Sequence, residues 1–557
     1  YEIMPSLVGS EMCIRDSSYD YTTVKGEKWY DPRTSNGEDE NGEVVKRIRE
    51  YKKMVWSNTL SYLTTFNNIH HLDFLAGYEI DDTYNDYLSG EAYNFTTPDK
   101  HAISNGMKTV SVGGSDSRYR LVSYLSRLNY DYKNKYYLGA SFRVDGSSRL
   151  HRDNRWGTFW SVSGAWRTIE EEFMQPVKDW LTDLRIRASY GVNGTLPSDY
   201  FGYMGLSSIS GGYLEQPGIQ MSQIANPNLK WETNYNMNIG LDFGFWDRLN
   251  FTIEYYTRTT KNLLMDCPVS MTTGFSSYLM NIGEVKNKGI ELTINSTNIK
   301  IKDFSWNTTF NLGHNSNKVV KLDGEQTQIV SGTQIHKVGS SYRTFYVQEF
   351  AGINPETGNP LFYTNELDEN GNYIKEITEN SKNAQFIPYK HAEPTVNGGI
   401  SNSLRYKWLD LNFLFSYQFG GYSYDTWAQK TEHGGYDSYA NIPTYYRDSW
   451  KKPGDQTNIE VYMPGKSSSV SMHKITSSRR IHSTDYFRLK NITFGITLPK
   501  EWTNKINIGN VRFYASASNL WTWAAYDNYD PEAVSAGSAT QTTPPLKTVT
   551  FGLNINF

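Results

Sequence analysis

Several features are scarce in these 557 residues, and each scarcity excludes a class of protein. No run of about 18–20 apolar residues occurs, which excludes a membrane protein built of helices. Charged residues make up 20% of the chain and the net charge is −4, so no basic footprint for nucleic acid exists. The two cysteines, Cys13 and Cys267, form no CxxC motif. We therefore expect neither a disulfide framework nor a structural zinc site.

The first residues lack the charged and apolar regions of a secretory leader. Residues 7–16 (LVGSEMCIRD) are similar to a translated transposon-end adapter used in sequencing libraries. We therefore predict that residues 1–17 are a sequencing-adapter artefact, and we exclude them from fold reasoning together with Cys13. The native sequence then comprises residues 18–557, which we expect to form one partial barrel.

Aromatic residues and glycine are abundant. Aromatics make up 15% of the chain, including 42 Tyr, and there are 44 Gly. So many aromatics exclude a disordered chain, and glycine with Asn, Ser and Thr favours strands joined by polar turns. In 183–192, for example, Leu184, Ile186 and Ala188 alternate with Arg185 and Arg187. This period of two is the signature of a strand with two different faces.

The same pattern predicts about fifteen strands. They lie near 55–66, 70–82, 119–132, 136–145, 157–167, 181–192, 235–245, 248–258, 288–299, 304–314, 394–405, 408–419, 486–498, 509–520 and 548–557. Short connections such as 133–135, 300–303 and 406–407 alternate with long ones such as 315–393 and 420–485. Strands of about 9–11 residues with alternating short and long connections are typical of a transmembrane β-barrel. The predicted fold is therefore all-β, a large antiparallel transmembrane barrel.

The two faces of these strands have predictable environments in such a barrel. Leu184, Ile186 and Ala188 should face lipid, and the arginines Arg127, Arg143, Arg185 and Arg187 should face the lumen. Strand-end aromatics would form interfacial girdles, namely Tyr130, Tyr132, Tyr136 and Tyr255. The last strand ends on an aromatic residue, Phe557. The long connections 315–393, 420–485 and 521–547 should share one end. A short helical cap is expected at Thr168–Met174, where acidic residues suit a first turn.

Six segments carry a resemblance to a known family. They are 124–132 (YLSRLNYDY), 142–148 (FRVDGSS), 184–191 (LRIRASYG), 226–233 (NPNLKWET), 281–291 (NIGEVKNKGIE) and 487–492 (FRLKNI). In this order they resemble the SusC/RagA family of TonB-dependent outer-membrane transporters, from about residue 50 to the end. The resemblance implies a multi-pass barrel in the outer membrane that imports glycan or peptide fragments. It also implies a SusD-like surface lipoprotein as lid and the TonB complex as the energy source.

The chain departs from this family in what precedes the barrel. We find no plug domain and no TonB-contacting segment in the sequence. Barrels of this kind have about 22 strands, so about fifteen strands would be a truncated barrel. We therefore expect an open, curved sheet with unpaired edges near 55–66 and 548–557.

Three motifs could suggest chemistry, but simpler explanations suit them better. Asp-Gly in Asp145-Gly146-Ser147-Ser148 signals a hairpin turn rather than a nucleophile loop. His70 and His71 are adjacent on a strand and point to opposite faces, so they would not converge on a metal ion. The segment 368–372 (DENGN) lacks the order of a calcium loop and is expected to be a turn. We predict no enzyme activity, no cofactor and no metal site.

Aromatic residues in the long connections are the candidate substrate contacts. In 420–485 these are Tyr424, Trp427, Tyr436 and Tyr439, and in the last connection Trp521 and Trp523. Aromatic faces beside polar groups suit sugar rings or extended peptides, although the same residues could pack the loops together or against a lid. Asp455 and Asp530 lie near prolines and are expected to form turns.

The leading functional prediction is TonB-dependent import of an oligomeric nutrient, either a glycan or a peptide. One alternative is a passive porin or an adhesin-like barrel, which would conduct ions without any plug being removed. A second alternative is a soluble carbohydrate-binding β protein, which would purify without detergent.

Overall fold

Period-two segments of the sequence form one antiparallel sheet. The structure is a computed structural model that describes residues 11–213, 216–322, 327–435, 441–464, 472, 475–503, 505, 508–539 and 542–556. In this part of the chain, sixteen strands pair in the order β1-β2-β3-β4-β5-β6-β7-β10-β11-β14-β15-β25-β26-β29-β30-β33. Their bounds are β1 Glu11–Tyr30, β2 Glu43–Phe66, β3 His70–Phe95, β4 Gly106–Tyr132, β5 Tyr136–Ser147, β6 Trp156–Trp166, β7 Leu181–Thr195, β10 Glu232–Phe245, β11 Leu249–Lys261, β14 Glu284–Lys300, β15 Phe304–Lys321, β25 Val396–Tyr406, β26 Leu409–Phe419, β29 Tyr486–Thr497, β30 Asn510–Ala524 and β33 Thr548–Asn556.

Shorter elements lie in the connections. The strands are β8 Leu206–Tyr213, β9 Gln216–Gln223, β12 Leu264–Pro268, β13 Ser277–Asn281, β16 Gln328–Ser331, β17 Gln334–Lys337, β18 Thr344–Gln348, β19 Phe350–Ile353, β20 Pro360–Tyr363, β21 Glu366–Leu367, β22 Tyr373–Ile374, β23 Ile377–Thr378, β24 Phe386–His391, β27 Tyr422–Asp425, β28 Ile481–Ser483, β31 Val534–Ser535 and β32 Ser538–Ala539. The α-helices are α1 Thr426–Thr431 and α2 Lys500–Thr503. The 3₁₀ segments are η1 Ile103–Asn105, η2 Thr168–Glu170, η3 Glu172–Val177, η4 Met271–Thr273, η5 Ser381–Asn383, η6 Thr444–Asp448, η7 Ser478–Arg480 and η9 Pro531–Ala533. Within the described ranges, no helix is long and apolar enough to cross a membrane.

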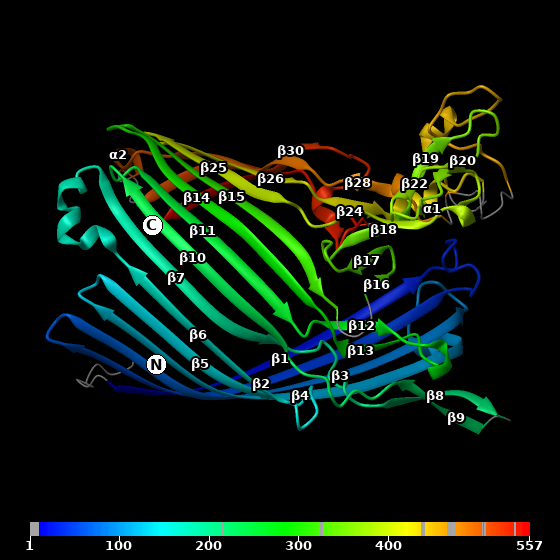
Figure 1. The fold of residues 1–557 in the computed structure, drawn as a ribbon, viewed down its shortest axis with the longest axis horizontal. Helices are drawn as coiled ribbons and strands as arrows, with labels where there is room; N and C mark the ends of the chain where they lie inside the picture. Colours follow the sequence, from blue (N-terminus) through cyan, green and yellow to red (C-terminus); the bar gives the residue numbers. More distant parts are fainter. Residues whose placement is uncertain are drawn as a thin grey trace. The chain divides into compact units, whose positions relative to one another are not determined.

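The described residues form two compact units. The first unit comprises the described residues of 11–166, 188–236 and 260–282, and the second comprises those of 167–187, 237–259 and 283–556. In the first unit, β1 to β4 are long neighbouring strands (Figure 1). In the second unit, β14, β15, β25, β26, β29, β30 and β33 pair in sequence order. Each of these sheet strands pairs with the next one along the chain, as expected for strands linked by direct turns or loops.

Polar side chains share one face of the strands in each unit. In the first unit, Arg143 donates to Asp145 at 2.7 Å and to Ser123 at 2.9 Å. In the second unit, the Nε atoms of Arg185 and Arg187 both lie 3.0 Å from Asp242 Oδ2 on β10. The prediction that these two arginines share one face is therefore confirmed, and Ile186 between them lies exposed on the other.

A β-bulge at Lys490 keeps the apolar face continuous on β29. Leu489 pairs with Phe415, but Asn491 pairs with Leu414, so Lys490 is an extra residue in β29. Because of this insertion, Leu489 and Ile492 project from the same face although they are three positions apart. The sequence shows the same break, since its alternation shifts phase at 490–491.

Aromatic rings form two rows on the apolar face of β2 to β6 in the first unit. One row runs through Trp56, Tyr78, Tyr124 and Trp156, with neighbouring ring centroids 5.1–6.4 Å apart. The other row contains the predicted girdle residues Tyr130, Tyr132 and Tyr136, together with His70 and Trp166. Exposed apolar side chains lie between the rows, namely Leu60, Phe74, Leu128, Leu138 and Phe142.

The structure corrects the number of strands. It adds β1, whose residues 11–17 we had excluded, and β2 to β4 extend well beyond the predicted ends because their outer parts continue to pair. Among the described residues β1 pairs only with β2 and β33 only with β30. Among the described residues the large sheet has two unpaired edges, as predicted, but its first edge strand is β1 and not the strand at 55–66.

The first part of β1 has an inverted face pattern. Arg15 lies opposite Asn58, on the face that carries the aromatic row, whereas Ile14 lies opposite Thr59 on the polar face. Further along, Tyr19 and Tyr21 return to the apolar side. The inversion favours the hypothesis that residues 1–17 are foreign, which stays a prediction.

Two local predictions were wrong. Asp145 and Gly146 lie within β5 and not in a turn, because Asp145 is buried against Arg143 and continues the pairing. The ring of Trp156 covers Gly146, where a Cβ atom would lie 2.7 Å from it. The expected cap at Thr168–Met174 is not one helix but two 3₁₀ segments, η2 and η3, divided at Glu171.

Candidate functional site

Three long connections of the second unit meet at one end of its strands. They link β15 to β25, β26 to β29 and β30 to β33, and Figure 1 shows them gathered beyond β25 and β26. We call the described residues of 322–395, 420–485 and 525–547 the loop layer. Their meeting confirms the prediction that these connections share one end, as an even number of crossings requires.

Backbone pairing joins the second and third connections of the loop layer. β27 pairs in parallel with β32, and β28 and β31 complete a four-stranded sheet. The N–H of Tyr424 donates to the carbonyl of Gly537 at 2.8 Å. Gly537 has a φ of +81°, and a Cβ atom there would lie 2.7 Å from that of Ala392. Only glycine fits this close approach without strain.

The first connection joins the same layer through apolar and polar contacts. Phe345 and Val347 of β18 pack with Tyr424 in a fully buried cluster. Gln334 Nε2 donates to the carbonyl of Ala536 at 2.7 Å, and the N–H of Gln348 donates to that of Thr476 at 3.0 Å. Residues up to about 200 positions apart are therefore held together in one layer.

A buried ion pair anchors the middle connection. Arg480 Nη1 donates to Glu432 Oε2 at 2.7 Å, and Arg480 is only 1% exposed. Arg480 Nη2 also lies 3.3 Å from the carbonyl of Met472, and Tyr445 donates its hydroxyl to Glu432. Burial and the neighbouring Glu432 carboxylate raise the pKa of Tyr445 above its usual range. The pair therefore ties α1 to η7 inside the loop layer.

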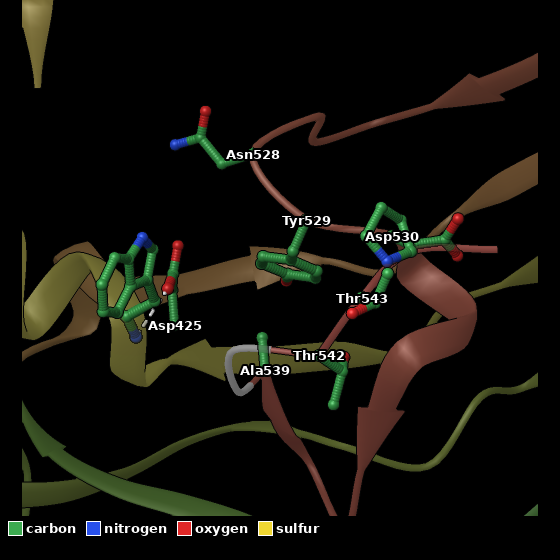
Figure 2. Close-up of a pocket in the computed structure, with 9 residues that line it drawn as sticks. Asp425, Asn528, Tyr529, Asp530, Ala539, Thr542 and Thr543 are labelled. Carbon is green, nitrogen blue, oxygen red and sulfur yellow. Dashed lines mark hydrogen bonds between the residues drawn. The ribbon is translucent and has the colours of Figure 1, made fainter. Parts of the chain in front are cut away.

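A pocket of about 430 Å³ opens in the loop layer (Figure 2). Trp427, which is 42% exposed, lies at the start of α1, and the other wall comes from the third connection. Figure 2 shows the Tyr529 ring between Asp425 and Asp530, with Thr542 and Thr543 nearby. The complete lining is Asp425, Trp427, Asn528, Tyr529, Asp530, Ala539, Thr542, Thr543 and Pro544.

Both carboxylates of the pocket are occupied by their own protein partners. Asp425 caps α1, because its Oδ1 accepts the N–H groups of Trp427 and Ala428 at 3.0 and 2.8 Å. Its Oδ2 accepts the hydroxyl of Tyr526 at 3.0 Å. Asp530 Oδ2 lies 2.5 Å from Nη2 of the buried Arg488. The pocket therefore offers a ligand mainly neutral groups.

A cluster of aromatic rings supports the residues that line the pocket. The Tyr526 ring stacks on His482 with centroids 3.7 Å apart, and Asn528 Nδ2 lies 2.6 Å from the Tyr526 hydroxyl. Tyr529 shares a hydrogen bond with Ser423, and burial raises the pKa of Tyr529 to about 12. Burial lowers the pKa of His482. Both rings are therefore favoured in their neutral forms.

The predicted contact residues of the middle connection have different positions. Trp427 lines the pocket, whereas Tyr424, three residues earlier, is 0% exposed and packs against Phe345. Tyr436 and Tyr439 lie outside the described residues. The structure thus places one of these four predicted side chains in the pocket wall.

Trp521 and Trp523 lie in β30 and not in the loop that we predicted. They pair with Leu489 and Phe487 on the apolar face, and both are about half exposed. Thr522 between them points to the other face and bonds the buried Arg488, which holds Asp530 of the pocket. The two tryptophans therefore lie on the face of β30 opposite to the pocket side.

Other candidate motifs have local roles. The Asp368 carboxylate accepts the N–H groups of Asn370 and Asn372 at 2.9 and 2.7 Å, which closes the β21–β22 turn. His70 Nδ1 lies 2.7 Å from the hydroxyl of Tyr130, and His71 Nδ1 lies 2.9 Å from that of Thr65. No group of three or more His, Cys, Asp or Glu side chains suited to a metal ion occurs in the described ranges.

Sequence reasoning missed part of the pocket. It gave Asp530 only a turn role, whereas this residue caps η9 and also pairs with Arg488. It did not consider Asn528, Thr542 or Thr543. The polar run that contains the two threonines precedes the last strand, but nothing in its pattern distinguishes it from an ordinary loop.

Comparisons with known proteins agree on one kind of barrel. Residues 14–373 match the family described as "TonB dependent receptor-like, beta-barrel". The chain is 32% identical over 547 residues to TonB-dependent receptor P3 of Formosa agariphila, covering 93% of this chain and 53% of that protein. It is 29% identical over 541 residues to TonB-dependent receptor SusC of Bacteroides thetaiotaomicron, covering 93% and 51%.

Solved structures give the same result. The structure of the RagAB peptide transporter superposes with a TM-score of 0.87 and 26% sequence identity, covering 100% of this chain and 61% of that one. The chain spans about half the length of the curated relatives it matches.

Proposed function

Because the chain belongs to the TonB-dependent receptor β-barrel family of the outer membrane, we propose that it is the barrel of an active importer for an oligomeric nutrient. TonB would supply the energy by acting on the whole protein. This chain spans about half the length of its curated relatives. The proposed activity is transport, without a chemical step on the substrate.

The pocket in the loop layer is the observation that favours one substrate class, a neutral oligosaccharide. Its exposed groups are the Trp427 indole, the Asn528 amide and the hydroxyls of Thr542 and Thr543. An aromatic face with a few neutral hydrogen-bonding groups suits a sugar ring with many hydroxyls. Because Asp425 and Asp530 are already bonded within the protein, the pocket presents little charge for the ends of a peptide.

A peptide is the alternative substrate. The similarity to the RagAB peptide transporter supports it. A peptide bond also offers neutral donors and acceptors, but it lacks the flat, polyhydroxylated ring that an exposed indole suits. The two substrates therefore predict different effects of removing Trp427.

The proposed partner is a SusD-like surface lipoprotein that covers the loop layer. Exposed apolar side chains on this layer suit a protein partner, because a loop surrounded only by water gains no stability from exposing them. They are Val330, Leu367, Tyr373, Ile374, Ile377 and Met463.

Uptake by the producing bacterium tests the proposal. Deletion of the gene should abolish accumulation of a labelled neutral oligosaccharide, and a protonophore should do the same in cells that carry the gene. A passive porin predicts uptake that the protonophore leaves unchanged, together with ion conductance of the isolated protein. Uptake of labelled peptides alone would contradict the glycan assignment but leave import intact.

A matched pair of variants tests the pocket. Trp427→Ala should raise the half-saturating oligosaccharide concentration about tenfold, which corresponds to ~1.4 kcal/mol. Trp523→Ala removes a similarly exposed indole from the opposite face of β30 and should leave uptake affinity unchanged. Equal effects of the two variants would refute a role for this pocket.

A further inference from the structure

The segment 487–492 (FRLKNI) reaches the pocket of the loop layer through Arg488. This residue lies on the polar face of β29, between Ser416 of β26 and Thr522 of β30, and is only 2% exposed. Its Nε donates to Thr522 Oγ1 at 2.9 Å, and its Nη2 lies 2.5 Å from Asp530 Oδ2. Asp530 also lines the pocket. One guanidinium therefore connects two strands of the large sheet with the wall of the pocket.

A second carboxylate, that of Glu532, completes this network. Its Oε2 accepts hydrogen bonds from Arg488 Nη1 and, at 2.6 Å, from Lys490 Nζ. Its Oε1 accepts the hydroxyl of Tyr486 at 3.1 Å. The side chains of Asp530 and Glu532 are only 11% and 19% exposed, so both carboxylates depend on these partners. The two cations of the network balance its two carboxylates.

The β-bulge in β29 supplies the second cation. Lys490 is the extra residue of this strand, and its ammonium lies beside Arg488 because both bond the same oxygen of Glu532. The next residue, Asn491, faces the same side, since its Nδ2 lies 3.3 Å from Ser516 Oγ. Bulges re-aim side chains in this way next to functional sites. The bulge thus adds a lysine to the polar face without removing the asparagine from it.

The two carboxylates are held in a fixed relation by η9. Asp530 Oδ1 accepts the N–H of Glu532 at 2.9 Å and so caps this 3₁₀ segment. Pro531 between them is buried, and its ring restricts the backbone. Because one turn carries both carboxylates, Arg488 binds them with two nitrogens of its planar fork. A shift of this turn would therefore break both bonds together.

The pocket wall depends on side-chain contacts for its position. In the part of the chain that the structure describes, the backbone of 526–533 makes hydrogen bonds only within that run. β31 and β32, which follow it, belong instead to a sheet with β27. Tyr526 and Tyr529 attach the run through their hydroxyls. Its ion pairs within the described ranges are those with Arg488 and Lys490.

We propose that Arg488 is a positioning residue for substrate binding, which holds the wall Asn528–Asp530 where this wall and the Trp427 indole contact the same oligosaccharide. Figure 2 shows Asn528, Tyr529 and Asp530 following one another along the pocket. Arg488 does not line the pocket and acts through Asp530. Hydrogen bonds between charged groups are stronger than those of neutral hydroxyls, so Arg488 is the main anchor. The inference rests on the proposed import of an oligosaccharide.

Hydrogen exchange of the full-length protein in detergent tests whether Arg488 holds this wall. In Arg488→Gln the amide of Glu532, which bonds Asp530, should exchange roughly tenfold faster than in the wild type. The control Arg512→Gln breaks a comparable two-bond pair with Asp410 at the other end of β30 and should leave this exchange unchanged. Slow exchange of the β30 amides would confirm that each variant is folded. Unchanged exchange in Arg488→Gln would overturn the proposal.

Uptake kinetics test whether the position of the wall matters for the substrate. Arg488→Gln should raise the half-saturating oligosaccharide concentration about fivefold and keep the maximal rate per folded molecule within about twofold. Arg488→Lys keeps the charge but loses the fork, so its value should lie between those of the wild type and Arg488→Gln. It remains measurable if Arg488→Gln does not fold. When Arg488→Gln is already present, Trp427→Ala should add less than about threefold, because both changes act on one site. Arg512→Gln should have no effect.

A role of Arg488 in folding alone predicts a different result. It would lower the maximal rate and the amount of protein at the cell surface but leave the half-saturating concentration unchanged, and this result would overturn the proposal. Fully additive effects of Arg488→Gln and Trp427→Ala would overturn it as well. If wild-type cells imported no oligosaccharide, the proposed function would fail, and the exchange of Glu532 would still decide whether Arg488 holds the wall.

Discussion

The Arg480–Glu432 pair should control whether the loop layer stays closed. Arg480→Met leaves Glu432 buried without its main partner, because Glu432 is only 8% exposed. Breaking a buried pair costs roughly 3–5 kcal/mol. Glu432 keeps the hydroxyl of Tyr445 and lies 3.7 Å from Arg479 Nε, so we expect the lower end, about 3 kcal/mol.

Protease cutting of the middle connection measures this cost. When opening is fast relative to cutting, the cutting rate follows the population of the open form. A loss of about 3 kcal/mol therefore predicts cutting within 420–485 that is faster by roughly 100-fold. The control Arg447→Met removes an exposed arginine from the same connection and should change the rate less than twofold.

A double variant separates the buried charge from lost packing. Arg480→Met with Glu432→Met removes both charges, and replacing a buried pair by apolar groups is often nearly neutral. It should restore most of the resistance, apart from about 1 kcal/mol for the Tyr445 hydroxyl left without an acceptor. If the single and double variants were cut equally fast, the uncompensated-charge argument would be refuted.

Four further predictions concern the strands and the loop layer. Ile186→Arg should destabilise the folded protein by roughly 2–4 kcal/mol in denaturant titrations, because it places a charge in lipid, whereas Ile186→Ala should cost less. On intact cells, protease should cut within 420–485 but not at 301–303; the reverse pattern would invert the topology. Burial lowers the pKa of His482 and outweighs the opposite effect of the nearby Asp425 and Glu432 carboxylates. The unfolded loop therefore binds more protons than the folded loop. Resistance to protease should fall as the pH drops below about 6.5, and it should fall less in His482→Gln. Burial raises the pKa of Tyr529 to about 12; the layer should keep its stability up to about pH 10 and lose it as the pH rises towards 12, in step with tyrosinate absorbance.

The alternation of the sequence was sufficient to predict the strands and their faces. Because side chains of a strand point alternately to its two sides, Arg185 and Arg187 had to share a face opposite Ile186, and they do. The break at 490–491 was also visible in the sequence, since the apolar positions shift phase there. In the large sheet, the number of strands was underestimated where the first residues were set aside as foreign, and the short strands within the connections were not predicted.

The loop layer depended on tertiary structure. Tyr424 and Trp427 are equally aromatic and three residues apart, yet one is fully buried and the other lines the pocket. Their difference comes from β27 pairing with β32, more than 100 residues away, and from α1 starting at the Asp425 cap. Loops have no periodicity, so local sequence carries no record of such distant contacts. Thus the sequence determined the strands and their two faces, whereas only the tertiary structure decided which loop side chains meet, because long-range packing selects them.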